Sequence, residues 1–142
     1  MNIQPLHPNF SLPTRGTNMA GAFDVYMPEG GVISDWDTEG VMVPLGFAAE
    51  IPEGYVALLL PRSGVGAKYG LELHNTCGVI DADYRGEWKA CLSCKQPGKF
   101  EWFKGDRLVQ FLIVPVLTPE LNIVRDLSAT ARGTGGFGST NQ

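Results

Sequence analysis

The chain has 142 residues, of which 44% are hydrophobic, so it is long and apolar enough to fold as one domain and is not disordered. Its 18 glycines and 10 prolines argue against a helical bundle, because both residues destabilise the interior of a helix. The formal net charge of −4 offers no basic surface for nucleic acid, so we expect no nucleic-acid partner.

Apolar runs divided by turn residues predict a series of short strands. In chain order these runs cover residues 40–51, 55–60, 88–94, 108–116 and 122–125. Pro52 and Gly54 mark a turn after the first run, and the unbroken apolar run at 55–60 predicts a buried strand. The glycine-rich residues 132–142 have too little apolar content to order themselves. We therefore predict an all-β barrel or sandwich over residues 1–131, followed by a mobile tail.

The cysteines and the first residues bear on the cellular compartment. Three cysteines make no disulfide framework, and an odd count is typical of free thiols in a cytosolic protein. Cys91 and Cys94, with His74 and Cys77 nearby, also have the spacing of zinc ligands. However, a separation of three residues on a strand places Cys91 and Cys94 on opposite faces, so we favour buried free thiols.

Neither a signal peptide nor a transmembrane helix is readable in the chain. The first residues lack a basic segment followed by an apolar one, and no apolar run approaches about 18 residues. We therefore expect a cytoplasmic protein, in the host cytoplasm if the source is viral, with no membrane partner.

Residues that bind anions, bases or sugars concentrate at five places. Asp24 interrupts an apolar run, and residues 61–68 follow the 55–60 strand with arginine, serine and glycines. Backbone N–H groups, a hydroxyl and a guanidinium are the donors that phosphate prefers. Residues 75–84 combine an amide, acids and an aromatic ring, and residues 105–110 place polar groups at a strand entry. Residues 132–140 join a cation, an aromatic ring and hydroxyls in a segment with no folding reason to hold them.

These five places resemble the five sequence motifs of the deoxyuridine triphosphatase (dUTPase) family. In order they read AGAFDV (20–25), PRSGVGAKYG (61–70), NTCGVIDADYRGE (75–87), GDRLVQ (105–110) and RGTGGFGST (132–140). The chain departs from the family at Ala22, Phe23, Gly66 and Cys77, where it keeps a small or aromatic residue. Residues 29–39 are less similar and are predicted to form a variable loop.

The resemblance implies a jelly-roll-like β fold that assembles as a homotrimer with three active sites at subunit interfaces. The tail would reach over a neighbouring subunit's site. The implied reaction is attack of water on the α-phosphorus of dUTP, with Mg²⁺, to give dUMP and pyrophosphate. This reaction lowers dUTP and supplies dUMP for dTMP synthesis.

The resemblance also implies a role for each motif. Asp81 would deprotonate the attacking water, Gln110 would hold it from the other side, and Asp24 would reach Mg²⁺ through water. Substrate binding is implied for Arg62, Ser63, Gly64, Asn75, Gly78, Val79, Ile80, Tyr84, Arg132, Phe137, Gly138, Ser139 and Thr140.

Within that set, the segments divide by the part of the nucleotide that they would contact. Residues 62–64 would bind phosphates, and residues 75–80 would read the uracil edge. Tyr84 would pack under the deoxyribose and exclude a 2′-hydroxyl. In the tail, Phe137 would stack on uracil while Arg132, Ser139 and Thr140 bind the γ-phosphate. Asp83, Arg85 and Glu87 would shape the turn or form interface ion pairs, and Asp106 and Arg107 would form a structural pair.

Two alternatives remain at this point. A dCTP deaminase-like enzyme has a similar fold and phosphate motif but needs a glutamate on the strand after the hairpin, and residues 88–94 contain no carboxylate. A dUTP-dependent regulatory module would bind a protein partner, with residues 29–39 as the docking surface. The deaminase would release ammonia from dCTP, and the regulatory module would capture its partner only with dUTP.

Overall fold

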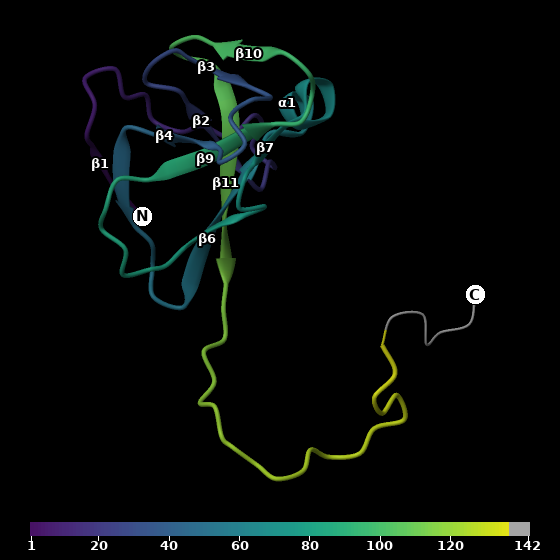
Figure 1. The fold of residues 1–142 in the computed structure, drawn as a ribbon. Coiled ribbons are helices and arrows are strands. Elements are labelled where there is room, and N and C mark those ends of the chain that lie inside the picture. Colours follow the sequence, from purple (N-terminus) through teal and green to yellow (C-terminus); the bar gives the residue numbers. More distant parts are fainter. Residues whose placement is uncertain (137–142) are drawn as a thin grey trace.

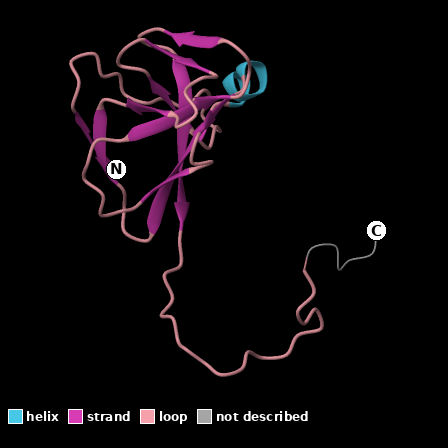
Figure 2. Cartoon of the chain, in the orientation of Figure 1, coloured by secondary structure: helices cyan, strands magenta, loops and turns pink. Residues whose placement is uncertain are grey.

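The computed structural model describes residues 1–136, which are almost entirely strand and loop (Figures 1 and 2). The elements in chain order are β1 (Asn2–Pro5), β2 (Phe23–Tyr26), β3 (Gly31–Ser34), β4 (Val41–Pro44), β5 (Phe47–Glu50), β6 (Tyr55–Pro61), α1 (Ser63–Tyr69), β7 (Leu71–Leu73), β8 (Gly78–Ile80), β9 (Lys89–Cys94), β10 (Lys99–Trp102) and β11 (Arg107–Pro115). The strands expected over 55–60, 88–94 and 108–116 are confirmed as β6, β9 and β11. The run at 40–51 is divided into β4 and β5.

The strands form four small antiparallel sheets. The largest has the order β2-β11-β6-β8, and the second has the order β4-β9-β7. The pairs β1-β5 and β10-β3 complete the fold. β11 pairs with β6 along most of its length, from Val109 opposite Pro61 to Pro115 opposite Tyr55. This arrangement confirms the expected all-β, jelly-roll-like class, and it places β3 inside the segment 29–39 that was expected to be a loop.

An aromatic cluster from β5, from β11 and from the residue before β9 lies in the core. Phe47, Trp88 and Phe111 are each at most 1% exposed. The Trp88 ring centroid lies 5.1 Å from that of Phe47 and 5.1 Å from that of Phe111. On β9 the inward residues Ala90 and Leu92 alternate with less buried ones, as expected for a strand with one face on the core. The core therefore fixes β5, β11 and the start of β9 relative to one another.

The short helix α1 was not predicted, because its two glycines lower helix propensity. Its boundaries are set by the residues on either side. Arg62 precedes it in extended conformation, and Gly70 ends it with a φ of 64°, a left-handed value that glycine adopts without strain. The Gly70 N–H donates to the Gly66 carbonyl at 2.9 Å. The helix buries no residue, so it serves as a connector at the end of β6.

The chain leaves the barrel after β11. Residues 116–136 run away from it as an extended arm (Figure 1). Leu117, Leu121, Ile123 and Leu127 on this arm are almost fully exposed. The strand predicted at 122–125 is absent from the described chain, because no neighbouring strand of this chain supplies backbone partners there. The predicted domain of residues 1–131 therefore includes a stretch, 116–131, that lies outside the barrel.

Within residues 1–136, no helix has the length and apolar character that spanning a bilayer requires.

Candidate active site

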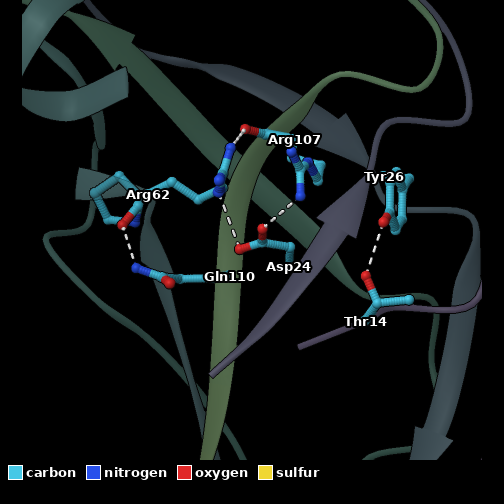
Figure 3. A network of polar contacts seen from close by, with 7 residues as sticks. Thr14, Asp24, Tyr26, Arg62, Arg107 and Gln110 are labelled. Carbon is cyan, nitrogen blue, oxygen red and sulfur yellow. Dashed lines mark hydrogen bonds and ion pairs between the residues drawn. The ribbon is translucent and has the colours of Figure 1, made fainter. Parts of the chain in front are cut away.

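A buried carboxylate anchors the first cluster of polar residues (Figure 3). Asp24 on β2 is 8% exposed, and it is the only charged side chain that is buried among the described residues. Arg62 donates from Nε to its Oδ1 at 2.9 Å, and Arg107 donates from Nη1 to its Oδ2 at 3.1 Å. Two charge-assisted bonds compensate the carboxylate for its loss of water.

A β-bulge brings the residues of the fourth motif onto one face. Arg107 is opposite Tyr26 and Gln110 is opposite Asp24, so three steps on β11 match two steps on β2. Regular alternation would separate Arg107 and Gln110 onto opposite faces, because their numbers differ by three. With the extra residue, both lie beside Asp24 (Figure 3). The expected pair of Asp106 and Arg107 is wrong, because Arg107 pairs with Asp24 and the Asp106 carboxylate instead accepts the Phe103 N–H.

Arg62 is held in place by backbone groups as well as by Asp24. Its Nη1 donates to the Arg107 carbonyl at 3.1 Å, and its own N–H donates to the Leu108 carbonyl at 2.9 Å. Gln110 donates from Nε2 to the neighbouring Pro61 carbonyl at 3.1 Å. These bonds join the end of β6 to β11, so the second and fourth motifs form one rigid unit with Asp24.

The start of α1 faces solvent beside this network. Ser63 and Gly64 are exposed, and the first backbone N–H groups of a helix have no partner within the helix. A cavity of about 560 Å³ is bordered by both Arg62 and Arg107. The start of α1 and the two arginines together supply hydroxyl, amide and guanidinium donors, which suit the oxygens of a phosphate chain.

The third motif forms a separate pocket around β8. A cavity of about 360 Å³ is lined by residues of this motif and by its neighbours on β4, β6 and β9; from the predicted site it contains Asn75, Gly78, Val79, Ile80, Asp81 and Tyr84. Asn75 donates from Nδ2 to the Cys77 carbonyl at 3.3 Å. Thr76 between them has a φ of 69°, which is strained for a β-branched residue and is typical of functional loops.

The two clusters do not meet within one chain. β8 and β11 are separated by β6, and Ile80 is opposite Ala57 whereas Gln110 is opposite Leu60. Two strand spacings across the sheet and four residues along it separate the Cα atoms of Asp81 and Gln110 by about 16 Å. The structure therefore does not bring the two predicted catalytic residues to one water molecule within a single subunit.

The acidic and basic residues of the Asp83–Glu87 turn shape that turn. Glu87 accepts the Gly46 N–H at 3.1 Å, and Arg85 donates to the Ala82 carbonyl at 2.7 Å. Arg85 also lies 3.9 Å from Glu50. These contacts support the turn-shaping role that was one of the two expected for these residues.

The cysteines do not assemble a metal centre. Cys91 lies 4.0 Å from the Glu39 carbonyl, whereas Cys94 lies 3.4 Å from the Tyr69 carbonyl. All three cysteines are free and half-buried rather than fully buried. No group of three His, Cys, Asp or Glu side chains within residues 1–136 is arranged to hold a metal ion.

The fifth motif lies at the end of the arm. Arg132 is exposed and donates from Nε to the Gly135 carbonyl at 3.2 Å. The predicted residues Phe137, Gly138, Ser139 and Thr140 lie outside the described residues. A family model described as dUTPase matches residues 8–141, which contain all five motifs.

The chain belongs to the dUTPase family. Among curated relatives, deoxyuridine 5′-triphosphate nucleotidohydrolase of Nautilia profundicola is 38% identical over 142 residues, covering 100% of this chain and 99% of the relative. The same enzyme of Yarrowia lipolytica is 42% identical and covers 99% of this chain and 88% of the relative. A viral relative, from Paramecium bursaria Chlorella virus 1, is 36% identical and covers 97% of this chain and 95% of its own.

Solved dUTPase structures support the same assignment. The dUTPase of Staphylococcus bacteriophage 80alpha with dUPNHPP superposes with a TM-score of 0.89 at 29% identity, covering 99% of this chain and 98% of that chain. A dUTPase mutant from phage phi11 of S. aureus has a TM-score of 0.78 at 28% identity, covering 88% of this chain and 96% of that one. That structure concerns the coordination of a structural Mg(II) ion.

Sequence reasoning missed two features of this member of the dUTPase family. Arg107 was taken from the fourth motif as a structural partner of Asp106, and no pattern in the sequence shows the bulge that turns it toward Asp24. Gly86, in the third motif, lies against the hydroxyl end of the Tyr84 ring. Its glycine identity was the available signal, but a glycine in a predicted turn is common and does not by itself indicate contact with a ring.

Proposed function

We propose that this chain hydrolyses dUTP to dUMP and pyrophosphate by attack of water on the α-phosphorus. One observation carries the proposal: the same chain has both an ion network and a pocket large enough for a base. The network joins Asp24 to Arg62 and Arg107, and the pocket lies at the third motif. The membership in the dUTPase family supports it. We propose that the reaction takes place in the cytoplasm, or in a host's cytoplasm if the source is viral, where free thiols such as these are normal.

The complete site is made by more than one copy of the chain. The Cα atoms of Asp81 and Gln110 are separated by about 16 Å within one subunit, so one water molecule cannot contact both side chains there. This separation supports a shared site. The arm supports it as well, since its leucines and isoleucine are exposed in the isolated subunit and gain burial only against another surface. We propose that the assembly is a homotrimer, which the family resemblance supports.

Asp81 acts as the general base in this proposal. Its side chain is exposed at the rim of the pocket and next to β8, where an attacking water can reach it. Gln110 of a neighbouring copy orients the same water. The two residues divide proton removal and positioning between subunits.

The phosphate chain lies against Arg62, Ser63 and Gly64. Arg62 uses two of its donors on Asp24 and on the Arg107 carbonyl, and the guanidinium has further N–H groups for phosphate oxygens. Because these two contacts fix the guanidinium, it does not lose further freedom when substrate binds. The first amides of α1 add donors beside it.

The residues present fit a hydrated Mg²⁺ rather than one held by direct protein ligands. Asp24 accepts one arginine bond on each oxygen, so each oxygen keeps a second acceptor site for an ion's water molecules. No three-ligand cluster exists in the part of the chain that the structure describes. When bound to the substrate phosphates, Mg²⁺ would supply neutralisation of negative charge.

Main-chain groups of the third motif select the base. Residues 78–80 form the narrow edge strand β8, and their backbone reads the uracil edge with Asn75 alongside. A 5-methyl group would clash there, and cytosine would present a donor where uracil presents an acceptor. Such a buried mismatch costs far more than a missing methylene. Tyr84 packs under the deoxyribose. From the tail, Phe137 stacks on the base, Arg132, Ser139 and Thr140 bind the γ-phosphate, and Gly138 contributes to substrate binding.

Pyrophosphate release tests the activity. The purified chain is assayed with dUTP, dCTP, dTTP and UTP, each with and without Mg²⁺, and ammonia is measured in parallel. We expect pyrophosphate from dUTP at a rate far above that from the other three nucleotides, and faster with Mg²⁺. Ammonia from dCTP, or equal rates with all four nucleotides, would contradict the proposal.

Complementation tests the shared site. Asp81→Asn and Gln110→Ala variants are produced separately and together in one cell, and the mixed oligomers are isolated with two different tags. If the two residues of one site come from different chains, the mixture regains part of the activity that each variant lacks. If both come from one chain, the mixed oligomers stay as inactive as the separate variants.

A further inference from the structure

The Tyr84 ring lies in contact with the backbone of Gly86. A Cβ atom placed on Gly86 would lie 2.3 Å from the Tyr84 hydroxyl oxygen, 2.5 Å from Cζ and 2.9 Å from Cε2. Contacts this short do not occur, so no larger residue fits at 86 while the ring keeps its position. Gly86 is outside the left-handed backbone region, so the ring and not the backbone conformation requires glycine here.

The far end of the ring is fixed by the next residue. The Tyr84 hydroxyl donates to the Glu87 carbonyl at 3.2 Å. The Glu87 carboxylate accepts the Gly46 N–H at 3.1 Å, which ties the turn to the connection between β4 and β5. The backbone N–H of Trp88, the next residue, donates to the Phe47 carbonyl at 2.9 Å within the core. The surface that supports the ring is therefore anchored to the β4–β5 connection and to the hydrophobic core.

The rest of the ring has little support. Tyr84 is 45% exposed, and it lines the same cavity as the β8 residues Gly78, Val79 and Ile80. A half-exposed ring on a turn normally samples several rotamers. Here its position in the cavity depends on Gly86 beneath it and on the Glu87 carbonyl at its hydroxyl end.

We propose that Gly86 is a specificity-determining residue, which sets the position of the Tyr84 ring and thereby the width of the sugar slot that excludes a 2′-hydroxyl. The inference rests on the proposed function. Gly86 does not touch substrate; it is a positioning residue that acts through Tyr84. A side chain at position 86 displaces the hydroxyl end of the ring from the Glu87 carbonyl without disturbing the core, because the new Cβ meets only atoms of the half-exposed Tyr84 side chain.

The test compares Gly86→Ala with Gly16→Ala, whose Cβ would have open space and whose backbone is likewise outside the left-handed region. The readout is the ratio of kcat/KM for dUTP to that for UTP. We expect Gly86→Ala to lower this ratio by about tenfold or more with an unchanged unfolding midpoint, because small displacements of a positioning group have large effects on rate. Gly16→Ala should leave the ratio unchanged.

A double-mutant cycle separates action through the ring from a general structural effect. In a Tyr84→Ala background the clash is gone, so Gly86→Ala should cause no further change in the ratio. An equal loss with and without the ring would overturn the inference, and so would an unchanged ratio in Gly86→Ala alone.

The crystal structure of Gly86→Ala decides the inference independently of activity. We expect the Tyr84 ring to leave the position described here, and a ring in its original place would overturn the inference. If the unmodified chain releases pyrophosphate from neither dUTP nor UTP, the proposed function fails, and the ring position still shows whether Gly86 sets it.

Discussion

Replacing Asp24 by asparagine tests whether the ion network stabilises the subunit. The change keeps the shape of the side chain and removes its charge. Asp24 is 8% exposed, and both of its oxygens accept arginine N–H groups, at 2.9 and 3.1 Å. Asparagine keeps one acceptor oxygen, but its NH₂ group must then face an arginine donor, so at least one bond is lost.

The expected loss follows from the burial of the two partners. A hydrogen bond to a buried charged group contributes about 1.5–3 kcal/mol to the free energy of unfolding. The side chains of Arg62 and Arg107 are 32% and 40% exposed, so water partly replaces the missing partner. We therefore expect Asp24→Asn to lower the free energy of unfolding by about 2 kcal/mol, in the lower part of the range for the loss of one such bond.

Urea unfolding followed by tryptophan fluorescence measures this effect, since Trp88 and Trp102 are buried in the folded subunit. At an m-value of about 2 kcal/mol/M, the midpoint should fall by about 1 M. All samples need one protein concentration, because assembly would add to the apparent stability. The matched control is Asp126→Asn, whose carboxylate lies 3.9 Å from an exposed Arg125 and should change nothing measurable. A midpoint shift for Asp24→Asn no larger than that of the control would refute the reasoning.

Three further predictions concern the base, the tail and one surface carboxylate. Asp81→Asn should lower kcat for dUTP by about 10²–10⁴-fold while binding of a non-hydrolysable dUTP analogue stays near normal, and full turnover would exclude Asp81 as the base. Removing residues 132–142 should lower kcat/KM for dUTP strongly without changing the unfolding midpoint; unchanged kinetics would exclude a role for the tail in the site. The backbone N–H and hydroxyl of Ser34 lower the pKa of Asp37. Ser34→Ala should raise that pKa partway, because the backbone bond remains, and an NMR titration that finds no change would exclude the hydroxyl's contribution. Since the folded-state pKa of Asp37 lies below its unfolded value, its stabilisation is present above the unfolded pKa and is lost as pH falls through the folded one.

The strands that carry an unbroken apolar run were predictable, and the segments that depend on partners were not. Residues 55–60 and 108–116 contain enough apolar side chains to specify buried strands wherever they lie. Residues 122–125 have strand-like composition but no strand beside them in this chain, so composition alone gave a wrong prediction. The helix α1 was missed because its two glycines lower helix propensity, and among its flanking residues only Gly70, at its end, is a typical helix signal.

The candidate site was partly predictable for a similar reason. The five motifs identify which residues carry donors, acids and rings, because chemistry depends on residue type. Their grouping depends on pairing between strands. A bulge decides that Arg107 joins Asp24, and the sheet order decides that Asp81 and Gln110 lie apart in one subunit.

The sequence by itself determined the all-β class, the family and the set of groups available for chemistry, because these depend on local patterns of apolar, glycine and polar residues. Only the tertiary structure decided that Asp24 is buried between two arginines and that Gly86 supports the Tyr84 ring. The first fact arises from contacts between distant segments, whose register is fixed only when the chain has folded. The second depends on the direction that the Tyr84 side chain takes within its own turn. The many glycines likewise separate into those that end strands or helices, such as Gly54 and Gly70, and those that let another group approach closely, such as Gly86.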